Sequence, residues 1–479
     1  MIDYKAEFNR WIEEEKSAVS LLKSTGELMY EKGIELVFFR KNIVDTNIPK
    51  LMSLFKYAND VIGKKVNVSD VEKMANAISD ITDLAPSKLD VALLTSEYYE
   101  SNHENMNKFL IEKLSKFIGQ DKHTVRPKDI VLYGFGRIGR LVARELVKQA
   151  GKGQQLRLKA IVTRNISDEQ IKKRCALFKN DSVHGSFNGI VDIDYKDKYL
   201  IINGQSVKMI GANDPSKIDY TEYNINNALL IDNTGIFKDK KSLSVHLKSK
   251  GISKVLLTAP AKEVPNIVYG INNLDLDIES NNIFSAASCT TNAISPILKI
   301  IEDNYVIKKG HIETVHAYTN DQNLLDNMHK KPRRGRSAAI NMVITSTGAG
   351  NAVTKVIPSL LNKLTANAVR VPTPNGSLAI LKLSLGKATN VDEINNLIKK
   401  FSLSGRLVNQ IDYQIDTELV SNDIIGNTCC AVFDSNATIV SNNGEDIVLY
   451  TWYDNEFGYT KQVIRLAKQI AKVRRHTYY

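Results

Sequence analysis

A short glycine-rich turn between an apolar run and a helix-forming run constrains the fold of this chain most strongly. The run Ile130–Tyr133 predicts a buried strand, and it leads directly into Gly134-Phe135-Gly136-Arg137-Ile138-Gly139. Leu141–Gln149 then has the spacing of a helix. The three glycines allow a tight turn, the approach of a pyrophosphate and close packing of the helix on the strand. This arrangement predicts a doubly wound α/β (Rossmann) domain that binds a dinucleotide.

Later β-forming runs indicate a second domain. Strands expected at Leu158–Thr163, Leu229–Asp232 and Lys254–Thr258 extend the doubly wound sheet. Beyond residue 288 the β-forming runs are no longer each followed by a helix, which favours an α+β domain with a mostly antiparallel sheet. These runs are Ile312–Tyr318, Ala366–Val371, Ser377–Leu385, Thr428–Phe433 and Ile447–Tyr453.

The expected domains follow from these patterns. We predict a dinucleotide-binding domain over 126–288 and a catalytic domain over 289–455. A helical stripe in Tyr459–Ala471 predicts a C-terminal helix, within 456–475, that returns to the first of these domains.

Residues 1–125 differ from the remainder in charge and in periodicity. They contain 17 Lys+Arg and 20 Asp+Glu, a net charge of −3, whereas the remainder contains 47 and 33, a net charge of +14. Apolar residues at helical spacing in Trp11–Tyr30, Val71–Leu84 and Asn105–Ile118 predict an all-α extension. The basic remainder suits phosphates and dinucleotides. Because no RNA- or DNA-binding module accompanies that charge, we do not expect nucleic acid as a partner.

The apolar stretches, the start of the chain and the cysteines indicate a cellular compartment. No stretch approaches the ~18 apolar residues of a membrane span, and the start does not resemble a signal peptide. The four cysteines, Cys175, Cys289, Cys429 and Cys430, are too few and too scattered for a disulfide framework, and the pair Cys429-Cys430 lacks metal-ligand spacing. We therefore expect a cytoplasmic protein without a metal site.

Cys289 is the candidate nucleophile. It stands in Ser285-Ala286-Ala287-Ser288-Cys289-Thr290-Thr291-Asn292, immediately before a run with helical spacing. A helix N-terminus favours the thiolate, which is the nucleophilic form, and it also favours bound phosphate. Most free cysteines in proteins are buried small side chains and not nucleophiles. The interpretation of Cys289 therefore depends on the rest of the chain.

Taken together, these features resemble the phosphorylating glyceraldehyde-3-phosphate dehydrogenases. The resemblance covers Lys128 to Ala471, and residues 1–125 resemble the extension of a long-form variant. Seven motifs in the family's order carry it: Tyr133–Arg140, Asn180–Gly185, Ala287–Asn292, Val315–Thr319, Ser346–Ala349, Arg370–Pro374 and Trp452–Tyr459.

The resemblance implies a reaction and the residues that perform it. Cys289 would attack the aldehyde of glyceraldehyde 3-phosphate, and His316 would pair with the thiolate and take the hemithioacetal proton as hydride leaves. Phosphate would then convert the thioester to 1,3-bisphosphoglycerate, a step of glycolysis and gluconeogenesis. The family also implies a homotetramer.

Two anion sites and a cofactor site are implied in the same way. The substrate phosphate would bind Thr319, Asp321, Arg334 and Arg370, and the attacking phosphate would bind Ser288, Thr290, Thr347 and Gly348. The cofactor would bind Gly134, Gly136, Arg137, Ile138, Gly139, Arg164, Thr258 and Asn455. Asn455 would hold the nicotinamide carboxamide.

The choice between NAD and NADP stays open. An acidic residue normally ends the second strand and binds the ribose diol of NAD. Here the strand ends in Thr163-Arg164-Asn165, and the nearest acids are Asp168 and Glu169. Arg164 is either a cation for the 2′-phosphate of NADP or a solvated charge.

Two other functions compete with this interpretation. An erythrose-4-phosphate dehydrogenase would share the cysteine, histidine and cofactor motifs, although two complete anion sites favour the phosphorylating enzyme. A catalytically idle relative would act as a binding protein, which the intact site residues oppose. Product analysis with each sugar phosphate distinguishes an erythrose-4-phosphate dehydrogenase from the phosphorylating enzyme. Absence of turnover in the pure protein would indicate the catalytically idle relative.

Overall fold

The computed structural model describes residues 3–119 and 126–479 and divides the chain into two compact units. The larger unit consists of Lys128–Val147 and Arg157–Lys472, and the smaller of Met1–Pro127, Lys148–Leu156 and Val473–Tyr479. The boundary predicted near residue 125 lies outside the described residues. Among the helices that the structure describes, none has the length and apolar character needed to cross a membrane.

The smaller unit is mainly helical, as predicted, and also contains a sheet. Its helices are α1 (Tyr4–Glu27), α2 (Ile48–Tyr57), α3 (Val68–Asp80), α4 (Val91–Glu100) and α5 (Met106–Lys113). Its strands β1 (Glu35–Phe38), β2 (Lys41–Asn42), β3 (Ser87–Asp90) and β22 (His476–Tyr478) form one sheet in the order β2-β1-β3-β22. The apolar stripe of α3 is buried at Val71, Met74 and Ile78, which accounts for the helical periodicity.

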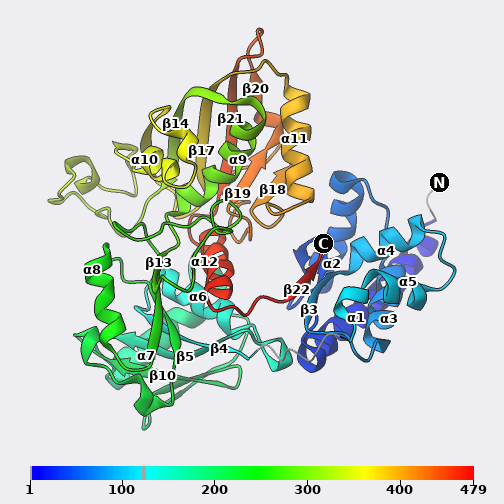
Figure 1. Cartoon of the computed structure of the whole chain (residues 1–479), viewed down its shortest axis with the longest axis horizontal. Helices are drawn as coiled ribbons and strands as arrows, with labels where there is room; N and C mark the ends of the chain where they lie inside the picture. Colours follow the sequence, from blue (N-terminus) through cyan, green and yellow to red (C-terminus); the bar gives the residue numbers. More distant parts are fainter. Residues whose placement is uncertain (1–2, 120–125) are drawn as a thin grey trace. The chain divides into compact units, whose positions relative to one another are not determined.

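The C-terminal end of the chain belongs to this smaller unit (Figure 1). Strand β22 runs parallel to β3, with Thr477 opposite Lys88. The side chain of Arg475 is 3% exposed, donates to the carbonyl of Gly153 and approaches Glu35. The smaller unit therefore differs from the predicted all-α extension of residues 1–125 in two respects. It contains a sheet, and one strand of that sheet comes from the C-terminal end of the chain.

The dinucleotide-binding domain has a mainly parallel sheet. Its strands are β4 (Lys128–Tyr133), β5 (Leu156–Thr163), β8 (Val191–Asp194), β9 (Tyr199–Ile202), β10 (Gln205–Gly211), β11 (Ala228–Asp232), β12 (Ile252–Leu257) and β13 (Ile283–Ser285), in the order β13-β12-β11-β4-β5-β10-β9-β8. Helices α6 (Arg137–Val147), α7 (Asp168–Lys179) and α8 (Lys240–Leu243) connect strands, and β6 (Asn180–Asp181) pairs with β7 (Gly185–Ser186).

The glycine-rich turn lies where the strand order reverses. Strand β4 lies between β5 and β11, so the crevice at its carboxyl end is the expected position of a ligand in a doubly wound sheet. Gly134 has φ +92°, and a Cβ there would come within 2.9 Å of Thr234. A Cβ on Gly139 would lie 2.5 Å from the carbonyl oxygen of Gly134, so glycine allows α6 to pack against the turn.

The catalytic domain contains the predicted, mostly antiparallel sheet. Its strands are β14 (Ile307–Ala317), β15 (Val343–Thr345), β16 (Leu364–Val371), β17 (Ser377–Leu385), β18 (Ile411–Gln414), β19 (Ala431–Asp434), β20 (Ile439–Val440) and β21 (Asp446–Tyr453). The order is β15-β16-β14-β17-β21-β19-β18, with β20 on β21. Its helices are α9 (Cys289–Tyr305), α10 (Ala349–Thr354) and α11 (Val391–Leu403).

The last long helix, α12 (Phe457–Ile470), lies beside α6 of the dinucleotide-binding domain (Figure 1). The ammonium group of Lys461 lies 2.7 Å from a carboxylate oxygen of Glu145 on α6. The two sheets and their connecting helices thus form one unit, and the candidate site lies within it.

Candidate active site

Cys289 is the first residue of α9, as the sequence predicts. Ser288 caps the helix, because its hydroxyl accepts a hydrogen bond from the backbone N–H of Thr291 at 3.0 Å. Ala287, just before the cap, has φ +56°, so the chain turns sharply into the helix. Cys289 thereby lines a cavity of about 650 Å³, which is also lined by His316 and by residues of the glycine-rich turn.

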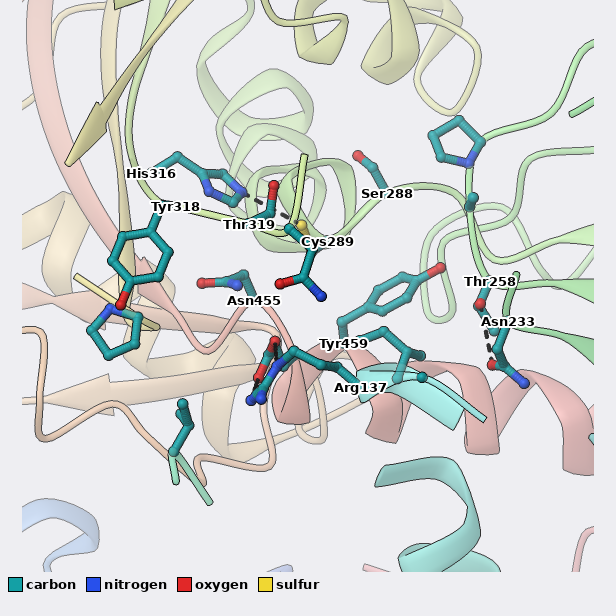
Figure 2. Close-up of a pocket in the computed structure, with 18 of the residues that line it drawn as sticks. Arg137, Asn233, Thr258, Ser288, Cys289, His316, Tyr318, Thr319, Asn455 and Tyr459 are labelled. Carbon is teal, nitrogen blue, oxygen red and sulfur yellow. Dashed lines mark hydrogen bonds and ion pairs between the residues drawn. The ribbon is translucent and has the colours of Figure 1, made fainter. Parts of the chain in front are cut away.

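His316 lies opposite the thiol, near the end of β14. Its Nε2 atom is 3.8 Å from the Sγ atom of Cys289, and Figure 2 shows the ring turned toward the sulfur. Its Nδ1 atom is 2.7 Å from the carbonyl oxygen of Ala317. The same Nδ1 atom lies 3.0 Å from Nη1 of Arg370, a group that can only donate. The carbonyl favours a proton on Nδ1 and the guanidinium group favours Nδ1 as an acceptor; Nε2 is an acceptor facing the thiol in the first of these tautomers.

Burial and charge determine the protonation states of this pair. Burial raises the pKa of the Cys289 thiol, and the positive charge of Arg370 opposes that shift. Burial and the charge of Arg370 together lower the pKa of His316 to about 3. These shifts favour a neutral thiol and a neutral imidazole in the resting site. They differ from the expected thiolate. The neutral ring of His316 can receive a proton, but its lowered pKa makes it a weaker base than an ordinary histidine.

The glycine-rich turn and Asn455 border the same cavity. Gly136, Arg137 and Ile138 line it, whereas Gly134 and Gly139 form the turn behind them. The Asn455 Oδ1 atom accepts a hydrogen bond from the hydroxyl of Ser377 at 2.9 Å. The Nδ2 group is therefore left to donate to a carboxamide oxygen.

Two further side chains on this side of the cavity are held in place. Thr258 lines the cavity, and its hydroxyl contacts the carbonyl of Asp232 at 3.0 Å. Arg137 is held by Glu456, at 2.5 Å between Nη2 and Oε2, and by Asp181. These three contacts hold the two side chains in place where the dinucleotide is expected to lie.

The residues predicted for the substrate phosphate lie around the histidine. Thr319 lines the cavity, and the Nη1 atom of Arg370 donates to the carbonyl of Ala317 at 2.8 Å. Arg334 forms an ion pair with Asp321 and donates from Nε to the hydroxyl of Thr345 at 3.0 Å. The structure thus places two guanidinium groups, which bind phosphate through paired N–H donors, near the reacting pair.

The residues predicted for the attacking phosphate are only partly brought together. Ser288 and Gly348 line a second cavity of about 300 Å³ beside the first. Thr290 is buried, with its hydroxyl 3.1 Å from that of Tyr453, and the hydroxyl of Thr347 accepts from the backbone N–H of Ala349. Neither threonine lines either cavity.

Comparisons with known proteins match both domains around this site. The family model described as "Glyceraldehyde 3-phosphate dehydrogenase, NAD binding domain" matches residues 128–240. That described as "Glyceraldehyde 3-phosphate dehydrogenase, C-terminal domain" matches residues 288–455. The chain belongs to the glyceraldehyde-3-phosphate dehydrogenase family. As a member of this family of oxidoreductases, it uses NAD or NADP as its cofactor.

Relatives in the glyceraldehyde-3-phosphate dehydrogenase family cover different shares of the chain. The "Glyceraldehyde-3-phosphate dehydrogenase-like protein" of Pseudomonas aeruginosa is 44% identical over 94% of this chain and 97% of its own length. The glyceraldehyde-3-phosphate dehydrogenase of Clostridium pasteurianum is 38% identical over 72% of this chain and 98% of its own length. Glyceraldehyde-3-phosphate dehydrogenase 2 of Nostoc sp. is 39% identical over the same shares. The alignment with the Pseudomonas protein therefore reaches well into the extension.

The acidic residue that binds the ribose diol of NAD in this dehydrogenase fold has no counterpart at the end of β5. Arg164 is exposed there and does not line the main cavity. Asp168 begins α7, with its Oδ1 atom 2.5 Å from the Nζ atom of Lys198. Within the described part of the chain, the residues at the end of β5 are Thr163, Arg164 and Asn165, none of which carries a carboxylate.

Four residues that line the two cavities of the dehydrogenase site were not predicted from the sequence. Lys238, Lys262 and Lys355 line the second cavity with Ser288, and Tyr459 lines the first. Tyr459 stands within a family motif, which was the available signal. The three lysines are far apart in the sequence and share no motif, so only the fold brings them to one cavity.

Proposed function

We propose that this protein converts glyceraldehyde 3-phosphate, inorganic phosphate and NAD(P) to 1,3-bisphosphoglycerate and NAD(P)H through a thioester on Cys289. The observation that carries the proposal is the 3.8 Å approach of the Cys289 Sγ atom to His316 Nε2 in a cavity bordered by the glycine-rich turn. A nucleophile beside a base, next to a dinucleotide turn, suits oxidation of an aldehyde. This reaction serves glycolysis or gluconeogenesis.

The first step is attack by the thiol. The Sγ atom of Cys289 forms a bond to the aldehyde carbon, and its proton passes to Nε2 of His316. The proton then moves to the former carbonyl oxygen, which gives a hemithioacetal. The contacts of Nδ1 with the Ala317 carbonyl and with Nη1 of Arg370 hold the ring so that Nε2 faces the thiol.

The second step oxidises the hemithioacetal. His316 takes the hydroxyl proton while hydride leaves the same carbon, and a thioester remains on Cys289. When bound, the nicotinamide ring supplies the carbon that accepts the hydride. Asn455 is positioned to orient that ring, because Ser377 occupies its Oδ1 atom and leaves the amide N–H groups as donors.

The phosphate groups are assigned to the two predicted anion sites. Arg370, Arg334, Asp321 and Thr319 would bind the phosphate of the aldehyde substrate. The attacking phosphate would approach past Ser288 and Gly348, which line the adjoining cavity, and would bind Thr290 and Thr347 as well. The sequence contains all four residues that the resemblance implies for the second anion site, which favours the phosphorylating enzyme over an erythrose-4-phosphate dehydrogenase.

Assembly as a homotetramer in the cytoplasm is part of the proposal. Large apolar side chains are exposed in the segment between β14 and β15, namely Leu324, Leu325, Met328, Ile340 and Met342. An apolar patch of this kind is typically covered by a second subunit. All four cysteines are free, which fits a reducing compartment.

The test is product analysis with the purified protein. Glyceraldehyde 3-phosphate and erythrose 4-phosphate are each incubated with NAD or NADP, with and without inorganic phosphate. We expect reduced cofactor and an acyl phosphate from glyceraldehyde 3-phosphate only when phosphate is present. Preferred turnover of erythrose 4-phosphate, or absence of turnover with tight binding of another protein, would replace this proposal with one of its alternatives.

A further inference from the structure

A buried histidine outside the reacting pair belongs to the wall of the main cavity. His184 ends the turn between β6 and β7, and its side chain is 5% exposed. The two residues before it, Ser182 and Val183, line the cavity. Asn455 and Glu456 line the same cavity from the segment between β21 and α12. The contacts of His184 show how these two walls are joined.

The ring of His184 contacts both acids that flank Asn455. Its Nε2 atom is 3.0 Å from Oε2 of Glu456, and its Nδ1 atom is 3.8 Å from Oδ2 of Asp454. A carboxylate oxygen can only accept, so Nε2 carries a proton and donates it to Glu456. The Nδ2 group of Asn375 also lies 3.5 Å from Nε2, but it donates to Asp454 at the shorter distance of 2.8 Å. His184 thus bridges the residues immediately before and after Asn455.

The acid before Asn455 depends on this bridge. The side chain of Asp454 is 0% exposed, and its Oδ1 atom accepts from the N–H groups of Glu456 at 2.9 Å and Phe457 at 2.7 Å. Within the described part of the chain, His184 is the only basic side chain at ion-pair distance from Asp454. A buried carboxylate that loses its basic partner is costly, so this segment should shift when His184 is removed.

The acid after Asn455 is held from two sides. Glu456 accepts from Nη2 of Arg137 at 2.5 Å as well as from His184. Burial raises the pKa of Glu456, but the hydrogen bonds and charges of Arg137 and His184 outweigh that effect and hold the pKa below its usual value. Glu456 is therefore ionised and repels Asp454. Because Arg137 keeps its pair with Glu456, removal of His184 should leave the glycine-rich turn in place.

We propose that His184 is a positioning residue for hydride transfer, which holds Asn455 in place through the two acids that flank it. The inference rests on the proposed function. In that reaction the C–H bond of the hemithioacetal breaks, hydrogen and its electron pair pass to the nicotinamide carbon, and His316 takes the hydroxyl proton. The amide N–H groups of Asn455 are the donors left for the carboxamide. A displacement of these donors by about 1 Å misplaces the ring and costs up to about a hundredfold in rate.

The first test measures cofactor affinity and needs no substrate. Whichever of NAD and NADP the parent binds more tightly is compared with its fragment that lacks nicotinamide, which is ADP-ribose or the 2′-phosphate of ADP-ribose. In His184→Ala we expect the dissociation constant of the cofactor to rise about three- to tenfold, the contribution of one hydrogen bond. The dissociation constant of the fragment should stay unchanged, because Arg137 remains held by Glu456.

The matched control removes a histidine from another part of the same unit. His311→Ala alters a side chain of β14 that is 43% exposed and lies outside both cavities. We expect this variant to bind the cofactor and the fragment as the parent does.

The second test follows the hydride itself. Single turnover with glyceraldehyde 3-phosphate that carries deuterium on the aldehyde carbon reports the transfer rate and the face of the nicotinamide that receives the label. We expect His184→Ala to slow transfer by about 10- to 100-fold and to place part of the label on the opposite face. A loss of stability alone would lower the number of active sites without changing the face.

Two measurements restrict the effect to hydride transfer. His184→Gln, whose Nε2 group can donate to Glu456, should restore most of the rate and the single face. Alkylation of Cys289 by iodoacetamide should be the same in the parent and in both variants. If His184→Ala does not fold, His184→Asn takes its place, because asparagine fills part of the site but has no atom at the position of Nε2.

The outcomes are distinct. Parent-like affinity, rate and facial selectivity in His184→Ala would overturn the positioning role, as would an equal loss of affinity for the fragment that lacks nicotinamide. Failure of His184→Gln to restore the rate would also overturn it. A parent that transfers no hydride from glyceraldehyde 3-phosphate would instead contradict the proposed function, and the affinity comparison would still decide the role of His184.

Discussion

The Asp168 carboxylate lies 2.5 Å from the ammonium group of Lys198, at the start of the helix that follows β5. In this dehydrogenase fold an acid at the end of that strand binds the ribose diol of NAD and repels the 2′-phosphate of NADP. Here Asp168 faces a lysine instead, and Arg164 is exposed at the strand end. Among the described residues, the end of β5 itself therefore carries no acid that would repel the 2′-phosphate of NADP.

We predict that the enzyme accepts NADP and that Arg164→Ala selectively weakens this use. A charge-assisted hydrogen bond contributes about 1.5–3 kcal/mol, which corresponds to about a ten- to hundredfold loss in kcat/KM for NADP. The values for NAD should change little. Asp168→Asn is the control, because a carboxylate that reached the ribose would favour NAD and its removal would change the NAD values. Strong NAD selectivity in the parent that Arg164→Ala leaves unaltered would contradict the prediction.

Cys289→Ser should abolish aldehyde oxidation while cofactor binding is retained. A serine hydroxyl is a much weaker nucleophile than a thiol beside the same base, and the substitution is nearly isosteric. Turnover is measured by reduced-cofactor formation and binding by fluorescence titration. Cys175→Ser, at a buried cysteine of α7 outside both cavities, is the matched control and should remain active. Substantial activity in Cys289→Ser would remove this residue from its role.

His316→Asn should slow acylation by about 10²–10⁴-fold, the usual contribution of a positioned acid–base group. Nε2 is the ring nitrogen that lies 3.8 Å from the thiol, and asparagine provides no comparable base. Single-turnover kinetics report the acylation rate, and circular dichroism checks that the fold is intact. An acylation rate within a few fold of the parent would show that another group accepts the proton.

The charge of Arg370 should control the reactivity of the thiol with pH. Burial raises the pKa of Cys289, whereas the guanidinium group stabilises the thiolate and opposes that rise. Removing the charge in Arg370→Met should therefore move the midpoint of iodoacetamide alkylation to higher pH. Arg370→Lys keeps the charge and should move it less. A midpoint that falls in Arg370→Met would contradict the assigned direction.

Deletion of residues 473–479 should destabilise the smaller unit. The deletion removes strand β22 and the buried Arg475, which donates to Gly153 and approaches Glu35. Hydrogen bonds to charged groups contribute about 1.5–3 kcal/mol each, so a loss of at least that size is expected in chemical denaturation.

Acylation should persist after this deletion, because every residue assigned to the reaction lies in the larger unit. Arg475→Met isolates the contribution of the arginine from that of the strand. Unchanged stability of the shortened chain would mean that β22 does not support the sheet.

Much of the fold and the centre of the site could be predicted because their signals are local. Glycine is required where a backbone turns tightly or another backbone approaches, so Gly134 and Gly139 identify the dinucleotide turn. Periodicity indicated the helices of the extension and the β-rich second domain. The position of Cys289 at the start of α9 followed from its neighbours in the sequence, and family motifs identified His316.

Tertiary structure decided the features that depend on residues far apart in the chain. Strand β22 (His476–Tyr478) pairs with β3 (Ser87–Asp90), which lies far from it in the sequence. No local pattern encodes that pairing. Lys238, Lys262 and Lys355 share a cavity only because two domains bring their loops together. The protonation of Cys289 and His316 depends on burial and on the charge of Arg370, which is far from both in the sequence but close to them in the fold. Desolvation is likewise a property of the packed site. The sequence alone determined which groups could react, and packing determined their charge states and neighbours.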